Sequence, residues 1–402
     1  MATGGSGTEG NSPFAWLGLL KWSLAFSDGT APSDVERMSE EDVAFLEKVM
    51  SEGIIDEGER MKSILKDVTG GLEIMLGANI TADGSGDGES KQEEKRKELE
   101  EDEMLELLQE LRDIVEQIDY ARAFMAMGGI PFLLGCATYH AAESAADRTI
   151  PKSIRKGALG VLSTMCQNNP PVQLSLLEHG HMPQLIQLFF DYTTGNDCGN
   201  DGDDSIREKV VQALSASIRG HSMAEHIFCQ NEQGKVMLQL GLGMQQKAPK
   251  PSSQLRKRSL FLLRALLTSD DATDERHELF QDVISFICTH EINEEWEEDA
   301  EIREMSLSML SQLLLHNPAQ SKQSSSQERV SKTILQHKNY IGGLGVNRIQ
   351  AIRNLKEGSE EREYATLELE EWERMMVALA EAENEGASDV PQLEICDMYV
   401  PP

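Results

Sequence analysis

Residues 154–162 read IRKGALGVL, and this pattern returns three times, as IREKVVQAL at 206–214, LRKRSLFLL at 255–263 and IREMSLSML at 302–310. Each copy opens with an aliphatic residue and an arginine. A small or β-branched residue follows the opener at four positions, an aliphatic residue at five and leucine at eight. Positions four, five and eight share one face of an α-helix. The pattern therefore predicts four amphipathic helices, each with the same apolar stripe.

The spacing of the copies indicates how these helices are arranged. Their openers stand 52, 49 and 47 residues apart, slightly more than the period of HEAT and armadillo repeats. Polar insertions at 196–204, 247–253 and 269–276 are expected to be loops between repeats. Hydrophobic residues make up 40% of the chain and aromatic residues only 5%, which favours a leucine-rich helical core over a β-sandwich. We therefore predict an all-α fold, an armadillo-like superhelical solenoid with helical caps at both ends.

Composition changes along the chain indicate its domain organisation. A Gly/Asp-rich stretch predicts a flexible linker before the repeats, and a Ser/Gln-rich run at 321–328 interrupts the repeat pattern. The last periodic segment has Leu367, Trp372, Met376 and Leu379 as a docking stripe. The predicted parts are an N-terminal flexible helical module (1–82), the linker (83–90), the armadillo-repeat solenoid (91–318), and C-terminal capping helices with a disordered tail (319–402).

Charge and cysteine usage narrow the range of partners and compartments. The chain has 69 acidic against 37 basic residues, a formal charge of −32, so it would repel a phosphate backbone, and nucleic acid is not expected as a partner. Six cysteines without Cys-x-x-Cys spacing argue against disulfides and structural zinc. The apolar run 14–26 has no cationic segment before it, and no uninterrupted membrane span follows. We expect a cytoplasmic monomer that does not enter a membrane.

The chain lacks the sequence motifs of common enzymes. No phosphate-binding loop, nucleophile elbow or His-Glu-x-x-His helix occurs, so we expect neither an enzyme nor a cofactor. His179 and His181 lack further ligands nearby, and no metal site is expected. The glycine-rich stretches 241–243 and 342–345 are interpreted as helix termini.

The third helix of an armadillo unit lines the partner-binding groove, and here the Ile-Arg helices take that place. Groove-facing positions are then two, six and ten after each opener: Lys156, Gly160, Thr164, Glu208, Gln212, Ala216, Lys257, Phe261, Ala265, Glu304, Ser308 and Gln312. An ordinary solvated helix face is the alternative for most of them. Phe261, flanked by Lys257 and Arg264, is the best candidate for an interface anchor.

The arginine of each copy needs a separate interpretation. It directly follows the opener of the buried stripe, at Arg155, Arg207, Arg256 and Arg303. Its five donors can bond the carbonyl oxygens of the preceding unit, or they can reach a partner. We favour the structural role.

Several short phrases resemble a known family. They are Leu20-Lys21-Trp22-Ser23-Leu24, Asp119-Tyr120-Ala121, Gly128-Gly129 and Gln167-Asn168-Asn169-Pro170. Together they resemble the armadillo-type nucleotide exchange factors (co-chaperones) of 70-kDa heat-shock chaperones, the family of yeast Fes and the mammalian heat-shock-protein-binding protein. The resemblance covers residues 14–385.

The resemblance implies an adaptor that clamps one lobe of the chaperone's ATPase domain along its concave side and so promotes ADP release and client release. Such a factor needs no reactive side chain, because it acts by binding the open form of the chaperone better than the closed form. The resemblance also permits Trp16, Leu20 and Trp22 to occupy the chaperone's client cleft, or to pack on the first repeat. The alternative function is a passive armadillo-repeat scaffold in the cytosol.

Overall fold

The computed structural model describes residues 56–77, 99–139, 149–193, 203–245, 249–315 and 325–388. Regular secondary structure within these ranges is helical throughout, which confirms the all-α prediction. The chain divides into two compact units between Ser63 and Ile64, and the fold below is that of the second unit. Several predicted features lie outside the described residues: the N-terminal stretch with Trp16, Leu20 and Trp22, the linker at 83–90, and the tail beyond 388.

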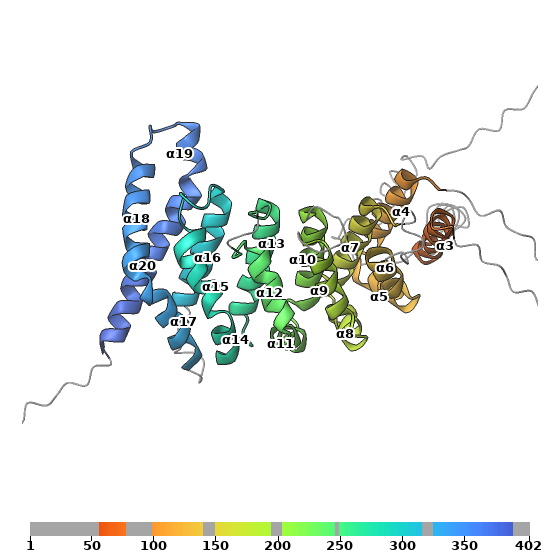
Figure 1. Cartoon of the computed structure of the whole chain (residues 1–402), viewed down its shortest axis with the longest axis horizontal. Coiled ribbons are helices and arrows are strands. Elements are labelled where there is room, and N and C mark those ends of the chain that lie inside the picture. Colours follow the sequence, from red (N-terminus) through yellow and green to blue (C-terminus); the bar gives the residue numbers. More distant parts are fainter. Residues whose placement is uncertain are drawn as a thin grey trace, which may run out of the picture. The chain divides into compact units, whose positions relative to one another are not determined.

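Four three-helix repeats follow one another along the second unit (Figure 1). The first consists of α5 (Ile118–Ala126), α6 (Gly129–Thr138) and α7 (Lys152–Cys166). The second consists of α8 (Pro170–Glu178), α9 (His181–Asp191) and α10 (Asp204–Ile218). The third consists of α11 (Ser222–Gln230), α12 (Glu232–Gly241) and α13 (Ser253–Leu267). The fourth consists of α14 (Asp274–Leu279), α15 (Gln281–Phe286) with a π-helical turn (Ile287–Glu291), and α16 (Ala300–Leu315).

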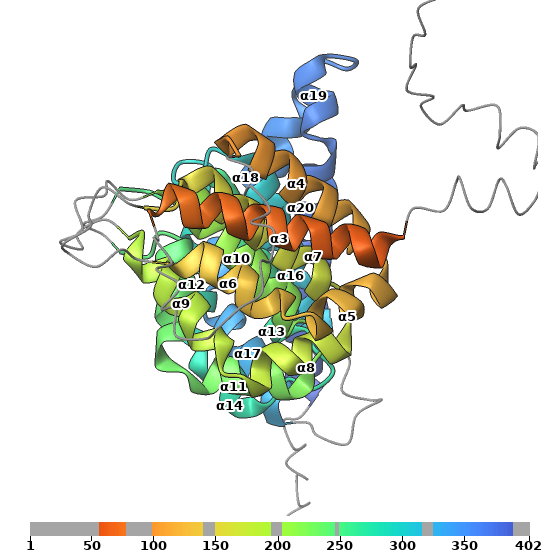
Figure 2. The ribbon, with the colours of Figure 1, turned by 90° about the vertical axis from the view of Figure 1, so that its right-hand side faces the viewer.

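The third helices of the repeats form a continuous row. Helices α7, α10, α13 and α16 pack on one another in this order, α4 (Glu101–Ile114) precedes α7, and α20 (Thr366–Ser388) follows α16. Figure 2 looks along the stack, where α8, α11 and α14 gather at the lower edge. Each Ile-Arg stretch lies at the start of such a third helix, so the repeated sequence pattern is the row itself. This arrangement is an armadillo-like solenoid.

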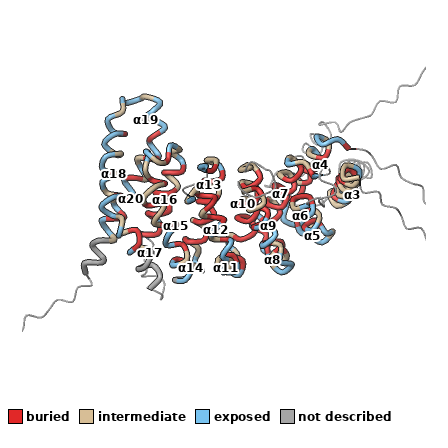
Figure 3. The backbone as a smooth tube through the Cα atoms, viewed as in Figure 1, coloured by how far each residue is buried: buried red, intermediate tan, exposed pale blue. Residues whose placement is uncertain are grey.

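The apolar stripe of each copy is buried, as predicted. Leu162, Leu214, Leu263 and Leu310 are at most 1% exposed, and Figure 3 shows the buried residues concentrated where helices of adjacent repeats meet. Burying a leucine side chain contributes about 1.5–3 kcal/mol. The row is therefore held together mainly by its repeated leucines.

The four arginines that follow the openers are buried as well, with exposed fractions of 3–5%. Arg155 donates to the carbonyl oxygens of Ala137, Tyr139 and Ile150, near the end of α6 and the start of α7. Arg303 donates to the carbonyl oxygens of Glu297 and Glu298. These bonds satisfy carbonyl groups at helix ends and in loops that would otherwise remain unpaired. Arg256 likewise donates to the carbonyl oxygen of Pro251, whereas Arg207 pairs with the Asp204 carboxylate. The arginines thus have structural contacts, but the carbonyl oxygens that they reach belong to their own repeat and not to the preceding one.

Glycines mark the turn between the first and second helices of the first two repeats. Gly128 and Gly180 have φ angles of +86° and +68°, a left-handed conformation that glycine adopts without strain. A Cβ atom on Gly129 would lie 2.3 Å from the ring of Phe124. The Gly-Gly and Gly-His phrases are thus local requirements of this turn.

The helical stack continues beyond the fourth repeat through α17 (Ser325–Gln336), α18 (Lys338–Arg353), α19 (Glu360–Tyr364) and α20. Trp372 and Leu379 of α20 are buried, as expected of its docking stripe, whereas Leu367 is 62% exposed. The interpretation of residues 342–345 as a helix terminus is wrong, because they lie inside α18. Gly345 allows α20 to approach closely, since a Cβ there would lie 2.8 Å from the Met376 sulfur.

Helix α3 (Glu57–Met75) precedes α4 in the chain, and its residues from Ile64 onward belong to the second unit. A Cβ on Gly71 would lie 3.0 Å from the Met104 sulfur and 3.2 Å from Leu99 Cβ. The second half of α3 therefore packs on the start of α4, so that helices from both sides of the predicted linker share one apolar contact.

Among the described residues, no single helix combines the length and apolar character of a membrane span. Helices α5 and α6 meet that criterion only as a pair, and the chain bends by 79° between them.

Candidate functional site

The candidate site is the outward side of helices α4, α7, α10, α13 and α16, which we call the row face. The predicted groove positions on it are exposed to different degrees. Phe261 and Gln312 are exposed, and Gly160 is buried, contrary to its expected place on the groove. The half-buried positions are Lys156, Thr164, Glu208, Gln212, Lys257, Ala265, Glu304 and Ser308. The row face therefore offers a partner a few protruding side chains rather than a continuous polar surface.

Phe261 is the most prominent apolar side chain among these positions, at 43% exposed. The Arg219 guanidinium lies 4.6 Å from the centre of its ring, a cation–π contact that holds the ring in place. An ordered, partly exposed aromatic ring is the kind of residue that anchors protein interfaces. Its predicted exposure is confirmed.

The expectation that Ala216 lies open to a partner is wrong. Ala216 is only 7% exposed, and its carbonyl oxygen accepts a hydrogen bond of 2.8 Å from Gln173 Nε2. Gln173 also donates to the carbonyl oxygen of Arg219, so α8 closes over the end of α10. The last turn of α10 is covered by α8 of the same repeat. Helical spacing within α10 alone does not indicate this contact.

Several polar groove positions are engaged within the chain. Lys257 lies 2.9 Å from the Asp299 carboxylate and also pairs with Glu301, both near the start of α16. Burial alone would lower the pKa of Lys257, but its hydrogen bonds to these two carboxylates raise it above the ordinary value. The charge of Lys257 is therefore already neutralised by its own chain.

Other groove positions form hydrogen bonds within the row, three of them to residues of the neighbouring helix or its N-cap and one within α10. Arg264 Nε donates to Gln312 Oε1 at 3.1 Å, and Glu208 Oε1 accepts from Ser252 Oγ at 2.6 Å. Gln212 Oε1 accepts from Lys209 at 3.3 Å, and Thr164 Oγ1 accepts from Arg112 Nε at 3.1 Å. These polar side chains are therefore engaged within the chain itself.

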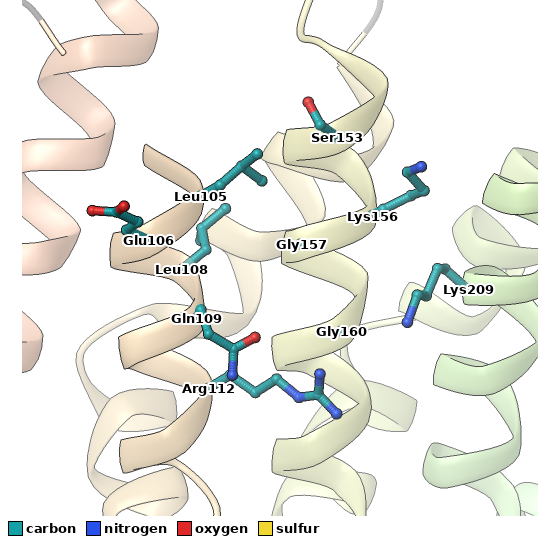
Figure 4. A pocket seen from close by; sticks show the side chains of 10 residues that line it. All are labelled: Leu105, Glu106, Leu108, Gln109, Arg112, Ser153, Lys156, Gly157, Gly160 and Lys209. Carbon is teal, nitrogen blue, oxygen red and sulfur yellow. The ribbon is translucent and has the colours of Figure 1, made fainter. Parts of the chain in front are cut away.

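A hollow of about 490 Å³ opens between α4, α7 and α10 (Figure 4). A Cβ on Gly160 would meet nothing within 4 Å, whereas one on Gly157 would lie 3.1 Å from Leu108 Cδ1. Gly160 thus keeps the hollow open, and Gly157 lets α4 approach α7. The lining residues are Leu105, Glu106, Leu108, Gln109, Arg112, Ser153, Lys156, Gly157, Gly160 and Lys209.

Sequence reasoning missed the basic residues Arg112, Lys209 and Arg258 near this hollow. Lys209 and Arg258 each stand three positions after their openers, and Gly157 is the corresponding residue of the first copy. At 100° per residue, positions three and ten lie only about 20° apart on a helix. Including position three among the groove positions would have found two of these residues. Arg112 lies on α4, which carries no copy of the pattern.

The phrases that carry the family resemblance have structural roles in the first two repeats. Asn169 is 1% exposed; its Oδ1 accepts from Arg122 Nε at 3.2 Å, and its Nδ2 donates to the Ile118 carbonyl at 3.4 Å. Asn168 takes a positive φ of 53°, and Pro170 begins α8. The Gln-Asn-Asn-Pro phrase therefore forms the turn that ties α8 to α5. It indicates an architecture rather than a contact surface.

Reactive side chains are not gathered in the part of the chain that the structure describes. No group of three or more His, Cys, Asp or Glu side chains there could hold a metal ion. His179 and His181 stack on each other with ring centres 5.9 Å apart. Burial raises the pKa of the Cys136, Cys166 and Cys288 thiols to about 12, so these cysteines are protonated and poor nucleophiles at neutral pH.

Comparison with known proteins found no matching family model and no matching curated protein. Among solved structures, an engineered protein is similar over 77% of this chain and 97% of its own, with 12% identity and a TM-score of 0.44. The armadillo repeats only protein from Plasmodium falciparum is similar over 74% of this chain and all of its own, with 12% identity and a TM-score of 0.35. Neither likeness assigns a partner to this chain.

Proposed function

We propose that this chain binds the ATPase domain of a cytosolic 70-kDa heat-shock chaperone on its row face and accelerates the release of ADP. The armadillo-like repeat fold supports a scaffold or adaptor role. The observation that carries the proposal is the ordered and partly exposed Phe261 ring, held by Arg219 in the middle of the row. Exposed aromatic rings in preorganised surroundings contribute strongly to protein association.

The exchange activity is supported by the sequence resemblance. An exchange factor must bind the open, nucleotide-poor chaperone more tightly than the closed form, and the difference in binding free energy shifts the chaperone towards opening. A rigid row suits this task, because a surface that does not adapt distinguishes two shapes of the same partner. The leucine stripe and the buried arginines supply that rigidity.

The experiment is stopped-flow release of a fluorescent ADP analogue from the chaperone, with the full chain added. Phe261→Ala is expected to weaken chaperone binding by about 1–3 kcal/mol and to slow stimulated release in proportion. Tyr364→Ala is the matched control, since Tyr364 of α19 is 79% exposed and lies outside the row. Equal release rates for the parent and both variants would contradict the assignment of Phe261.

A passive scaffold is the second candidate function, because the same row would serve it. The two functions differ in a single measurement on the parent protein. A scaffold that binds the chaperone leaves the rate of ADP release unchanged, whereas an exchange factor increases it.

A further inference from the structure

Three basic side chains line the hollow between α4, α7 and α10, and a fourth acts electrostatically on one of them. Arg112 comes from α4, Lys156 from α7, Lys209 from α10 and Arg258 from α13. Burial, followed by the positive charges of Arg258 and Arg112, lowers the pKa of Lys209, and Lys156 lowers it further. Each of the other three cations therefore repels Lys209, and keeping Lys209 charged at this place destabilises the folded chain unless a negative charge is present.

In the part of the chain that the structure describes, ion pairs do not neutralise this cluster. Among the described residues, no carboxylate oxygen forms a salt bridge with any of the four; Arg112 and Lys209 donate instead to Thr164 and Gln212, and the buried Nε of Arg258 has no hydrogen-bond partner. Neighbouring basic residues differ, because Lys257 and Arg256 both have carboxylate partners. In a chain of net charge −32, a cluster of cations without carboxylate partners is a local exception.

Two carboxylates border the cluster without closing it. Glu208 precedes Lys209 on α10 and opposes the lowering of its pKa, but its Oε1 is bonded to Ser252. Glu106 lines the hollow, and in Figure 4 its side chain points away from α7, whereas Arg112 reaches from α4 towards α7. The side of the hollow next to α7 and α10 is therefore positively charged.

The hollow also offers apolar contact. Leu105 and Leu108 of α4 point towards α7 in Figure 4, and the glycines Gly157 and Gly160 leave the facing surface without side chains. A volume of about 490 Å³ is within the range of sites that hold several side chains of a ligand. Apolar walls with basic groups at the rim suit a segment that carries both apolar and acidic side chains.

We infer that this cationic hollow, lined by Arg112, Lys156 and Lys209 with Arg258 beside it, binds an acidic segment of the protein partner. Carboxylates of that segment pair with the cations, and an aliphatic side chain between them contacts the half-buried Leu105. The strong negative charge of the whole chain disfavours nucleic acid, whose long phosphate backbone would extend past the hollow onto acidic surface. The inference rests on the proposed partner-binding function and adds the chemistry of the segment that is recognised.

The test uses the full chain and a fluorescein-labelled peptide of sequence Glu-Glu-Leu-Glu-Asp-Leu-Glu-Glu, with binding read by fluorescence anisotropy. Lys156→Glu is expected to weaken peptide binding about tenfold. Lys356→Glu is the matched control, because it makes the same charge change at an exposed lysine between α18 and α19; its effect is expected to stay below about twofold. A peptide with glutamine in place of each acidic residue should bind at least about tenfold more weakly than the acidic one.

Lys209→Glu serves as a second variant, and circular dichroism melting shows that each variant is folded. Equal peptide binding by Lys156→Glu, Lys209→Glu and Lys356→Glu, or no binding by the parent at low salt, overturns the assignment of the hollow. Tighter binding of an oligothymidylate of the same length than of the acidic peptide also overturns it. ADP release is measured separately: a parent that binds the peptide at the hollow but leaves ADP release unchanged refutes the exchange function alone.

Discussion

Glu368 of α20 connects three helices through one buried carboxylate, and its replacement tests how the C-terminal helices are held. Oε1 accepts from the Nε atoms of Arg303 and Arg348, both at 2.9 Å, and Oε2 accepts from their Nη2 atoms at 2.7 and 2.9 Å. Burial alone would raise the pKa of Glu368, but these two guanidinium groups hold it at about 2, against an ordinary value of 4.5. At 1.36 kcal/mol per pKa unit, the ionised carboxylate contributes about 3 kcal/mol to folding.

Glu368→Gln is therefore expected to lower the free energy of unfolding at pH 7 by about 3 kcal/mol, within the range for breaking a buried ion pair. The contribution is present above the unfolded-state pKa of Glu368 and is lost as the pH falls through the folded-state value. The gap between parent and variant should consequently narrow from pH 4.5 towards pH 2. Urea unfolding followed by circular dichroism measures it at each pH.

Glu373→Gln is the control on the same helix. Glu373 pairs with Arg353 at 2.7 Å, but both side chains are well exposed, at 45% and 61%. Exposed pairs contribute about 0.2–1 kcal/mol, so this variant should unfold close to the parent. Similar losses for Glu368→Gln and Glu373→Gln at pH 7 would refute the argument that burial gives the Glu368 cluster its strength.

Three further predictions follow from the packing. Leu263→Ala should lower the free energy of unfolding by about 2–5 kcal/mol, because Leu263 is fully buried. In the same urea titration, Leu315→Ala should lower the free energy of unfolding much less, because the Leu315 side chain is 40% exposed. Burial raises the pKa of Glu291 to about 7, so ionisation of this carboxyl group opposes folding as the pH rises from 4.5 through 7. Glu291→Gln should therefore raise the melting temperature at pH 8 and have little effect on it at pH 4. An equal change in melting temperature at both pH values would contradict the burial argument. A fragment of residues 89–402 should melt cooperatively but at a lower temperature than a fragment of residues 56–402, because Leu99 and Met104 lose their contact with Gly71. Equal melting temperatures would show that α3 adds no stability to the solenoid.

The repeats could be predicted from sequence because their cause is local. An aliphatic opener, a buried arginine and leucines at fixed offsets define one helical face wherever they occur, and the structure buries that face in all four copies. The residues between the copies carried less information. Residues 342–345 suggest a helix end by composition, yet they lie inside α18, where Gly345 lets α20 approach closely.

The candidate site was predictable only in part. Phe261 was identified because a ring at position six of a buried-stripe helix has to face outward. Ala216 could not be judged in the same way, since its burial depends on Gln173, 43 residues earlier in the chain. The cationic hollow depends on Arg112, Lys156, Lys209 and Arg258, which belong to four different helices and carry no shared sequence signal beyond helical position.

The sequence by itself determined the helical class, the repeat and the buried stripe, because these depend on the periodicity of residues within one helix. The tertiary structure decided which side chains remain available to a partner. It pairs Lys257 with Asp299 and with Glu301 at the start of α16. Among the described residues, no carboxylate forms an ion pair with Lys156 or Lys209, which line the hollow together with Gly160. Charge neutralisation and exposure are set by neighbours that come from other helices of the row, and the order of residues along one helix does not contain that information.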